Sequence, residues 1–337
     1  MTLASDTQTI GAEAPAQDTL NAAQGRSLRE IVISRLRRDK VAMVALIILI
    51  IVYLLAIFGP FIGPMFGFNP FAYDPAAVAT STGGPALPFG GISAQHPLGV
   101  EWGTGRDIAS QLLWGLRISL IVATASTVLV VSIGTVVGII AGYGGGWTDM
   151  LLGRFMDLIL AFPTLLVLIA MSAVLTQRLT DLGVPPGNPS RILYLVLAIS
   201  GFGWPYLARI VRGQVLSLRE REFVEAAVAA GASRRRILFT EILPNLWAPI
   251  LVYTTLALPA FIGLEAALSF LGVGVQEPSA SWGNMLNQAR SIRALTSFPW
   301  LLFVPGAAIF MTVMAFNFLG DGLRDALDPR RVSGGKA

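Results

Sequence analysis

Six long apolar segments restrict this chain to one class of fold. Crossing about 30 Å of hydrocarbon takes about 20 helical residues, and each segment is of that order. They occupy residues 41–62, 116–143, 155–175, 192–211, 246–271 and 300–319. Within a bilayer every backbone amide must be hydrogen-bonded inside the protein. Since 54% of the residues are hydrophobic and only 13% are charged, we predict an all-α integral membrane protein with about six transmembrane helices.

Residue counts exclude several kinds of chemistry. Cysteine is absent and His96 is the single histidine, which excludes disulfides, a thiol nucleophile and a Cys/His metal site. A Walker loop needs a lysine before Ser or Thr, after a glycine-rich turn, and neither Lys40 nor Lys336 has that setting. We therefore expect no enzyme, no bound cofactor and no metal. The arginines lie among the apolar segments, so nucleic acid is not an expected partner.

The lysines and arginines predict the orientation of the chain. If the amino terminus is inside, 18 of the 24 basic residues fall in cytoplasmic segments, namely 26–40, Arg154, 209–236 and 324–336. An excess of basic residues marks the cytoplasmic side of a membrane protein. Both termini are therefore expected in the cytoplasm.

Composition also predicts how the chain is divided. Residues 26–40 form a basic amphipathic segment that either lies on an anionic membrane surface or only orients the first helix. Asp107 is expected to cap a short interfacial helix, and Gly134, Gly138 and Gly142 should let another helix approach closely. The expected parts are a disordered tail at 1–25, the basic segment, a first transmembrane helix at 41–62, an extracytoplasmic loop at 63–115, a transmembrane core domain at 116–320 with a cytoplasmic loop at 214–245, and a cytoplasmic tail at 321–337.

The cytoplasmic loop has the pattern of a helical elbow. Phe223 and the alanines that follow it form a small apolar face, Gly231 suits a left-handed residue, and Ser233 can cap the next helix. We expect Pro244 to end the elbow. This elbow either docks in a groove of a soluble partner or is a solvated loop whose arginines obey the positive-inside rule, and composition favours neither.

The elbow resembles a known motif. Glu225-Ala226-Ala227, Gly231 and Leu243-Pro244 resemble the EAA loop in permease subunits of bacterial ATP-binding-cassette (ABC) importers. In the general pattern an isoleucine stands one residue apart from the Leu-Pro pair, whereas here Ile242 directly precedes Leu243. The peptide branch of the family has this arrangement.

Other passages are similar to the C-type permease of that branch, which comprises dipeptide, oligopeptide and nickel importers. His96-Pro97-Leu98-Gly99, followed by Gly105-Arg106-Asp107, is similar to the family's HPLGTD..GRD signature, although Val100-Glu101 replaces Thr-Asp and one residue is inserted. Further similar strings are Ala161-Phe162-Pro163 and those at 209–217, 265–274, 281–285 and 320–330.

The resemblance implies a fold, a set of partners and a location. It implies a type I importer permease in the bacterial inner membrane, which pairs with a homologous permease, two ATPase subunits holding ATP and Mg, and an extracytoplasmic peptide-binding protein. It also implies a coupling contact at Glu222, Phe223, Glu225, Ala226, Ala227, Gly231, Arg234, Leu243 and Pro244. The implied cargo is a di- or oligopeptide, and alternatives are a nickel chelate or another small solute.

A translocation path or gate is assigned to Glu265, Phe270, Trp282, Asn284 and Trp204. Glu265 is an acidic residue well inside an apolar segment, where a charge usually faces a cavity or a partner. It either contacts the amino group of a peptide or bonds to a neighbouring helix, and we favour the second. The rival functions are a gradient-driven secondary transporter, which would need inverted repeats and a coupling site, and a non-transporting scaffold.

Overall fold

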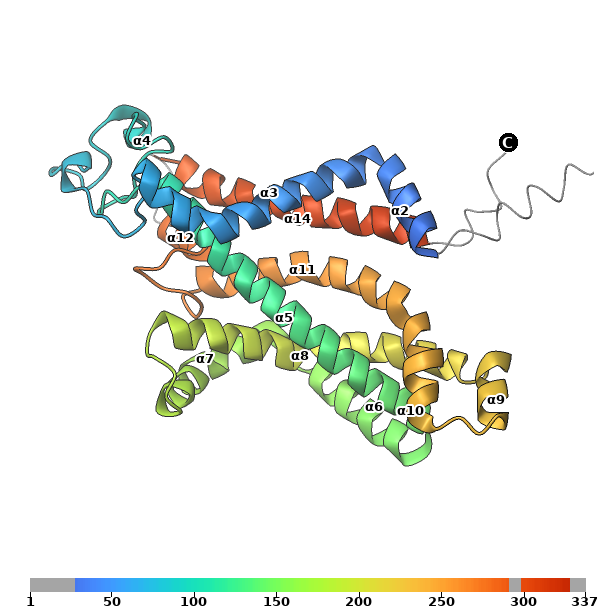
Figure 1. Cartoon of the computed structure of the whole chain (residues 1–337). Helices are drawn as coiled ribbons and strands as arrows, with labels where there is room; N and C mark the ends of the chain where they lie inside the picture. The colour runs from blue at the N-terminus through green and yellow to red at the C-terminus, as the bar shows by residue number, and fades with distance from the viewer. Residues whose placement is uncertain (1–27, 291–297, 328–337) are drawn as a thin grey trace, which may run out of the picture.

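The structure is a computed structural model that describes residues 28–290 and 298–327, and these form a bundle of long helices (Figure 1). The expected tail at 1–25, Arg26 and the last ten residues lie outside the described part. Six helical segments are long and apolar enough to cross a membrane, which agrees with the predicted number. They are Lys40–Phe66, Ile108–Gly144, Thr164–Asp181, Asn188–Leu218, Arg234–Phe270 and Trp300–Leu327.

The connections between the helices vary in length, and the longest lies between α3 and α5. In chain order the α-helices are α2 (Leu28–Arg38), α3 (Lys40–Ile62), α4 (Pro88–Gly91), α5 (Ile108–Gly144), α6 (Gly146–Ala161), α7 (Thr164–Asp181), α8 (Asn188–Leu218), α9 (Glu222–Ala229), α10 (Arg234–Arg236), α11 (Trp247–Phe270), α12 (Trp282–Gln288) and α14 (Trp300–Leu327). Short 3-10 turns η1 (Gly63–Phe66), η2 (Pro75–Ala77) and η4 (Leu243–Leu246), and a π-helical turn η3 (Ile237–Ile242), join them.

Helices α5 and α8 pack against each other through the predicted glycine face. A Cβ atom on Gly138 would lie 2.6 Å from the Ala208 carbonyl oxygen, and one on Gly142 would lie 2.7 Å from Cβ of Val215. Small residues at this spacing let two backbones approach where the lipid gives helices no hydrophobic reason to associate. The expected close approach is therefore confirmed, and its partner is α8.

Helices α3, α11 and α14 complete the bundle on the other side of α5, whereas α7 packs on α8. Helices α3 and α14 run side by side, and α11 lies between α14 and α5 (Figure 1). Tyr53 of α3 shares a hydrogen bond of 2.9 Å with Thr124 of α5. The largest buried apolar cluster includes Leu120, Tyr194 and Ile262, so α5, α8 and α11 meet at the centre of the protein.

The expected third segment, 155–175, is wrong in its bounds. The chain breaks at Phe162 and Pro163, so that α6 ends at Ala161 and α7 begins at Thr164. Proline has no amide hydrogen and forces the residue before it out of the helical region, and Phe162 has the extended angles φ −79° and ψ 136°. The second span also differs, because α5 begins at Ile108 instead of residue 116.

Ion pairs hold α6 against α8. Arg212 of α8 pairs with Asp149, and Arg209 pairs with Asp157. The hydrogen bond from the Arg212 guanidinium lowers the pKa of Asp149 below its ordinary value, although burial opposes this. Asp149 is therefore ionised and paired at neutral pH, and α6 is fixed alongside α8.

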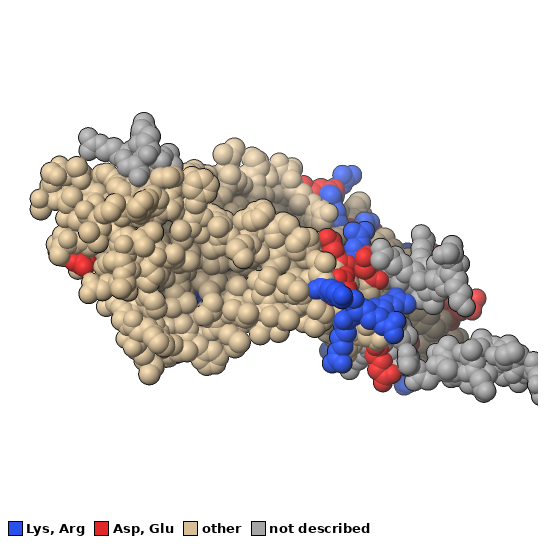
Figure 2. All heavy atoms as spheres, turned by 90° about the horizontal axis from the view of Figure 1, so that it is seen from above, with Lys and Arg blue, Asp and Glu red and all other residues tan. Residues whose placement is uncertain are grey.

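Charged residues are unevenly distributed between the two ends of the bundle. Helices α2, α9 and α10 lie at one end, which we call the α9 end, and α4 and α12 lie at the opposite α12 end (Figure 1). Viewed from above, lysines and arginines gather at the end that carries α2, and the face beyond them is almost wholly uncharged (Figure 2). This pattern is typical of a protein with one basic, solvent-facing end.

We predict that Gly138→Ala destabilises the protein by about 1–3 kcal/mol, because the new methyl group overpacks the contact with α8. The check is the thermal unfolding midpoint of the purified protein in detergent. Gly213→Ala is the matched control, since a Cβ there meets nothing within 4 Å. Equal midpoints for the two variants would contradict the assignment of this contact.

Candidate functional site

The predicted elbow forms at the α9 end of the bundle. Glu222 and Glu225 lie in the first turn of α9, where negative charge interacts well with the helix dipole. Gly231 has φ +77°, the left-handed conformation that was predicted. The Ser233 hydroxyl accepts a hydrogen bond of 3.4 Å from the amide of Arg236 and so caps α10, also as predicted.

Val224 is the residue that seats α9 on the bundle. It is 2% exposed and belongs to a cluster with Val215 of α8 and with Ile237 and Ile242 of η3. The opposite face is open to solvent. Phe223 on that face is 41% exposed, and the other outward residues of α9 are exposed as well. The exposed members of the predicted coupling set are Glu222, Phe223, Glu225, Ala226, Gly231, Arg234 and Pro244, whereas Ala227 and Leu243 are half-buried.

The expectation that Pro244 ends the elbow is wrong. The chain stays helical from Arg234 to Phe270, passing through the π-helical η3 and the 3-10 turn η4 before α11 begins. A proline cannot make the usual helical hydrogen bond and clashes with the carbonyl four residues earlier. The wider π turn lies directly before Pro244, where such a local change can accommodate the ring. The elbow is thus continuous with the membrane helix α11.

Glu265 lies at the α12 end and bridges two long helices. It is fully buried on α11 and accepts hydrogen bonds of 2.7 Å from Ser119 of α5 and 2.7 Å from Ser269. A buried polar group of this kind is costly unless its partners are in place. Of the two interpretations of Glu265, the bond to a neighbouring helix is therefore the one that the geometry supports.

Trp282 and Asn284 lie beside Glu265 in α12 and are buried. The Trp282 indole donates to the Leu112 carbonyl oxygen at 3.1 Å, and the Asn284 amide donates to the Ser279 carbonyl oxygen at 3.3 Å. A Cβ on Gly283 would lie 2.5 Å from the carbonyl oxygen of Ala266. Helix α12 is therefore wedged between α5 and α11. Trp282 bonds it to α5, whereas the Asn284 bond stays within the segment that leads into α12.

The other two path residues lie in different settings. Phe270 is 38% exposed at the end of α11, where its carbonyl oxygen accepts a bond from the Asn287 side chain of α12. Trp204 lies elsewhere, on α8, where it is 7% exposed and packs with Met156 and Ala208. The structure thus groups Glu265, Trp282 and Asn284, with Phe270 at the edge, and separates Trp204 from them.

Arg106 connects the long segment after α3 with the segment before α12, a role that sequence reasoning missed. It is 1% exposed and bonds to both carboxylate oxygens of Glu101, at 2.6 and 3.0 Å, and to the Pro278 carbonyl oxygen at 3.3 Å. Burial alone would lower the pKa of Arg106, but the hydrogen bond and charge of Glu101 outweigh it and raise this pKa. Arg106 with its bonds to Glu101 and Pro278 thus fixes the two segments to each other, and we call this group the Arg106 strut.

His96 joins two aspartates in the same region. Its Nδ1 lies 3.2 Å from Asp107 and its Nε2 lies 3.4 Å from Asp74. Asp107 also accepts a hydrogen bond of 2.7 Å from the amide of Ser110, so it caps a helix as predicted. That helix is the first turn of α5 and not a separate interfacial helix, because no break follows it.

Some of these residues carried a signal in the sequence. Ser269 stands four residues after Glu265, which places both on one helical face. The segment 101–107 around Arg106 holds three charged residues, Glu101, Arg106 and Asp107. Ser119 and Pro278 had no such signal, since each meets its partner only through the packing of distant segments.

This chain belongs to the family of binding-protein-dependent transport system inner membrane components, which its residues 134–333 match. Residues 27–79 match the N-terminal transmembrane domain of oligopeptide transport permease C. The protein is therefore a permease component located in the bacterial inner membrane. The family consists of membrane components and not of catalytic subunits.

Similar proteins support the same assignment. The oligopeptide transport system permease protein OppC of Haemophilus influenzae is 38% identical over 91% of this chain and 90% of its own length. The dipeptide transport system permease protein DppC of Alkalihalophilus pseudofirmus is 39% identical over 89% of both chains. A solved inward facing MetNI methionine ABC transporter chain aligns with TM-score 0.53 and 18% identity, covering 66% of this chain and 98% of that one. The fold is that of a type I importer permease.

We predict that Glu265→Ala lowers the free energy of unfolding by about 1–3 kcal/mol, because it leaves two buried serine hydroxyls without their acceptor. Glu265→Gln should be much milder, since an amide can accept from one serine and donate to the other. Thermal unfolding of the two variants in detergent measures the difference. If Ala and Gln were equally stable, Glu265 would not bridge α5 and α11.

Proposed function

We propose that this chain is one of two permease subunits of an ATP-driven importer for di- or oligopeptides. The cargo is inferred from the similarity to dipeptide and oligopeptide permeases over about nine-tenths of the chain. The glutathione transport system permease protein GsiD of Escherichia coli, 40% identical over 88% of the chain, also handles a short peptide by its name. A shared cargo class is the simplest account of these three relatives.

The α9 end faces the cytoplasm in this proposal. It carries most of the lysines and arginines, including the three exposed arginines of α10, and such an excess marks the cytoplasmic side. Both termini then lie inside, since the described chain begins with α2 and ends with α14 at this end (Figure 1). The α12 end faces outward, where an extracytoplasmic binding protein delivers cargo.

The elbow is the proposed contact with the ATPase subunits. Its outward face combines exposed Phe223 with Glu222, Glu225 and the exposed Arg234, an apolar centre with a charged rim that suits a protein groove. Because Val224 ties α9 to α8 and the chain continues helically into α11, a displacement of the elbow reaches two membrane helices directly. The loop is thus suited to convert closure of the ATPase pair into movement of the spans.

The energy for transport comes from partner chains in this proposal. Neither lysine of this sequence has the setting of a Walker loop, so ATP and Mg are held by two separate ATPase subunits. A second, homologous permease completes the pathway. A gradient-driven carrier would need none of these partners.

The experiment that tests the function is purification of the tagged chain from native membranes in mild detergent, followed by mass spectrometry and ATP-dependent peptide uptake in proteoliposomes. We expect a second permease, two ATPase subunits and a binding protein, with uptake that requires ATP and the binding protein. A chain that purifies alone and moves solute without ATP would contradict the proposal and favour a gradient-driven carrier.

We predict that Gly231→Val impairs ATPase association and ATP-driven uptake. A Cβ at Gly231 meets nothing within 4 Å, so the effect comes from placing a β-branched residue at φ +77°, which costs about 1–2 kcal/mol. Gly231→Asn should be close to wild type, since asparagine tolerates this conformation.

Gly272→Val is the control for general destabilisation. Gly272 has φ +82° and equally free surroundings, but it follows α11 at the α12 end. It should reduce stability to a similar degree and leave ATPase association intact. Equal loss of association in both valine variants would remove the support for a coupling role of Gly231.

A further inference from the structure

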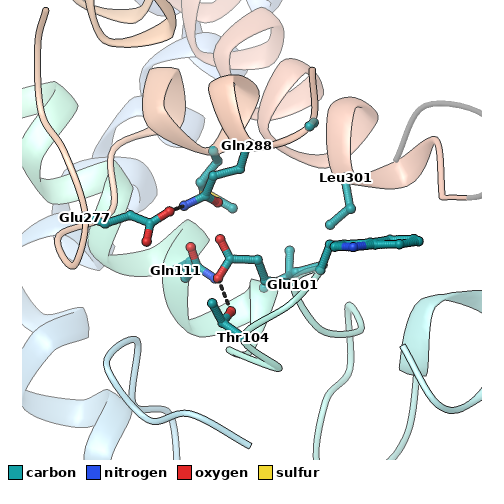
Figure 3. Close-up of a pocket in the computed structure, with 10 residues that line it drawn as sticks. Glu101, Thr104, Gln111, Glu277, Gln288 and Leu301 are labelled. Carbon is teal, nitrogen blue, oxygen red and sulfur yellow. Dashed lines mark hydrogen bonds between the residues drawn. The ribbon is translucent and has the colours of Figure 1, made fainter. Parts of the chain in front are cut away.

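A cavity of about 570 Å³ lies at the α12 end, between the segment before α5 and helix α12. Its size is in the range of small-ligand pockets, which is about 300–1,000 Å³. Figure 3 shows that side chains from opposite walls point into a common space, with Glu101, Thr104 and Gln111 on one side and Glu277 and Gln288 on the other. The cavity is built from parts of the chain about 170 residues apart in sequence.

The polar lining of the cavity is acidic. It contains the carboxylates of Glu101 and Glu277 together with two carboxamides, and none of the described lining residues is basic. Arg106, which is not a lining residue, pairs with Glu101 through the bonds already described. Glu277 is half-exposed and lies 3.5 Å from Arg106, and it accepts a hydrogen bond of 3.0 Å from Gln288. The two carboxylates share this one guanidinium, so the cavity wall keeps a net negative charge.

The rest of the lining is apolar and includes an aromatic ring. Ile108, Met285 and Leu301 supply aliphatic surface, and Trp102 supplies an indole. The Trp102 ring is held by Phe298, with ring centroids 5.4 Å apart. A carboxylate beside an aromatic face attracts a cation, and the aliphatic surface accepts a hydrocarbon stem.

We propose that this cavity binds an ammonium or guanidinium group of the arriving peptide together with the aliphatic atoms next to it. The inference rests on the proposed peptide function and on the outward orientation of the α12 end. The group is either the α-ammonium group of the peptide or the cationic end of a lysine or arginine side chain, and each is a cation that only donates hydrogen bonds. The ligand lies between Glu277 and Trp102, and the strut from Arg106 to Glu101 and Pro278 keeps the two walls together.

The absence of cysteine in this sequence makes a labelling test direct. Gln288→Cys places the only thiol of the chain in the cavity, and Thr104→Cys does so on the opposite wall. In the assembled importer, the labelling rates of each thiol by a cationic and an anionic methanethiosulfonate reagent are compared. An acidic cleft concentrates cations by tenfold or more, so the cation-to-anion rate ratio should exceed that of a control site by about tenfold.

Gln177→Cys is the matched control, because Gln177 donates to Asp181 at 3.0 Å just as Gln288 donates to Glu277 at 3.0 Å, but on the exposed end of α7. Glu277→Gln in the Gln288→Cys chain should remove most of the cation preference. Asp181→Asn in the Gln288→Cys chain should leave the cation preference unchanged. The same ratio at Gln288→Cys, Thr104→Cys and Gln177→Cys would overturn the inference.

Protection from labelling identifies the source of the cation. Alaninamide carries only an α-ammonium group, N-acetyl-lysinamide and N-acetyl-argininamide carry only a side-chain cation, and N-acetyl-alaninamide is the uncharged control. Protection by alaninamide indicates the peptide terminus, protection by either acetylated cation indicates a side chain, and protection by none of the three overturns the inference. Glu277→Gln should also raise the peptide concentration for half-maximal uptake severalfold, whereas Asp181→Asn should not.

These measurements separate the two proposals. Labelling and protection do not require transport. If the assembly shows the cation preference but takes up no peptide, the cation site stands and the peptide function is contradicted. Peptide uptake with no change in Glu277→Gln and no protection would retain the function and contradict the site.

Discussion

Helices in hydrocarbon gain little from the hydrophobic effect when they pack together, so they associate through close backbone approach and interhelical hydrogen bonds. Helix α5 provides both. Its glycine face admits α8, with Gly138 near the Ala208 carbonyl, and Tyr53 and Glu265 bond to it from α3 and α11. Helices α3, α8 and α11 are positioned against α5, and α7 and α14 pack in turn on these helices.

The same arrangement explains why a small surface helix can influence the membrane part. Helix α9 has eight residues, too few to be stable alone in water, and it is held by Val224 against α8 and η3. Its exposed face is therefore free for a partner while its buried face is fixed to the bundle. A short turn at residues 230–233 separates α9 from α10, and from Arg234 onward the chain is helical through the π turn and Pro244 to the end of α11. A push on α9 therefore reaches α11 through this turn and through the packing of Val224 against η3.

The sequence was sufficient for the number of spans, the glycine contact, the left-handed Gly231 and the caps at Asp107 and Ser233, since each depends on local chemistry or on periodicity. It failed at Pro244, because a proline kink can be absorbed by a neighbouring π turn that composition does not reveal. It also failed to find the Arg106 strut, whose partner Pro278 lies 172 residues away. At the α12 end it named Glu265, Trp282 and Asn284, yet only packing shows that all three are buried.

The burial of these residues limits where movement can occur. Glu265 joins α5 to α11, Trp282 joins α12 to α5, and Gly283 allows α12 to lie directly on α11. Separating these helices would strand buried polar groups at a cost of about 1–3 kcal/mol each, and separating α5 from α8 would open the glycine contact. The described helices therefore favour movement of this subunit as one stiff body. Under the proposed function, alternating access is then a change in the position of this subunit relative to the second permease, and the elbow transmits the movement of the ATPase subunits.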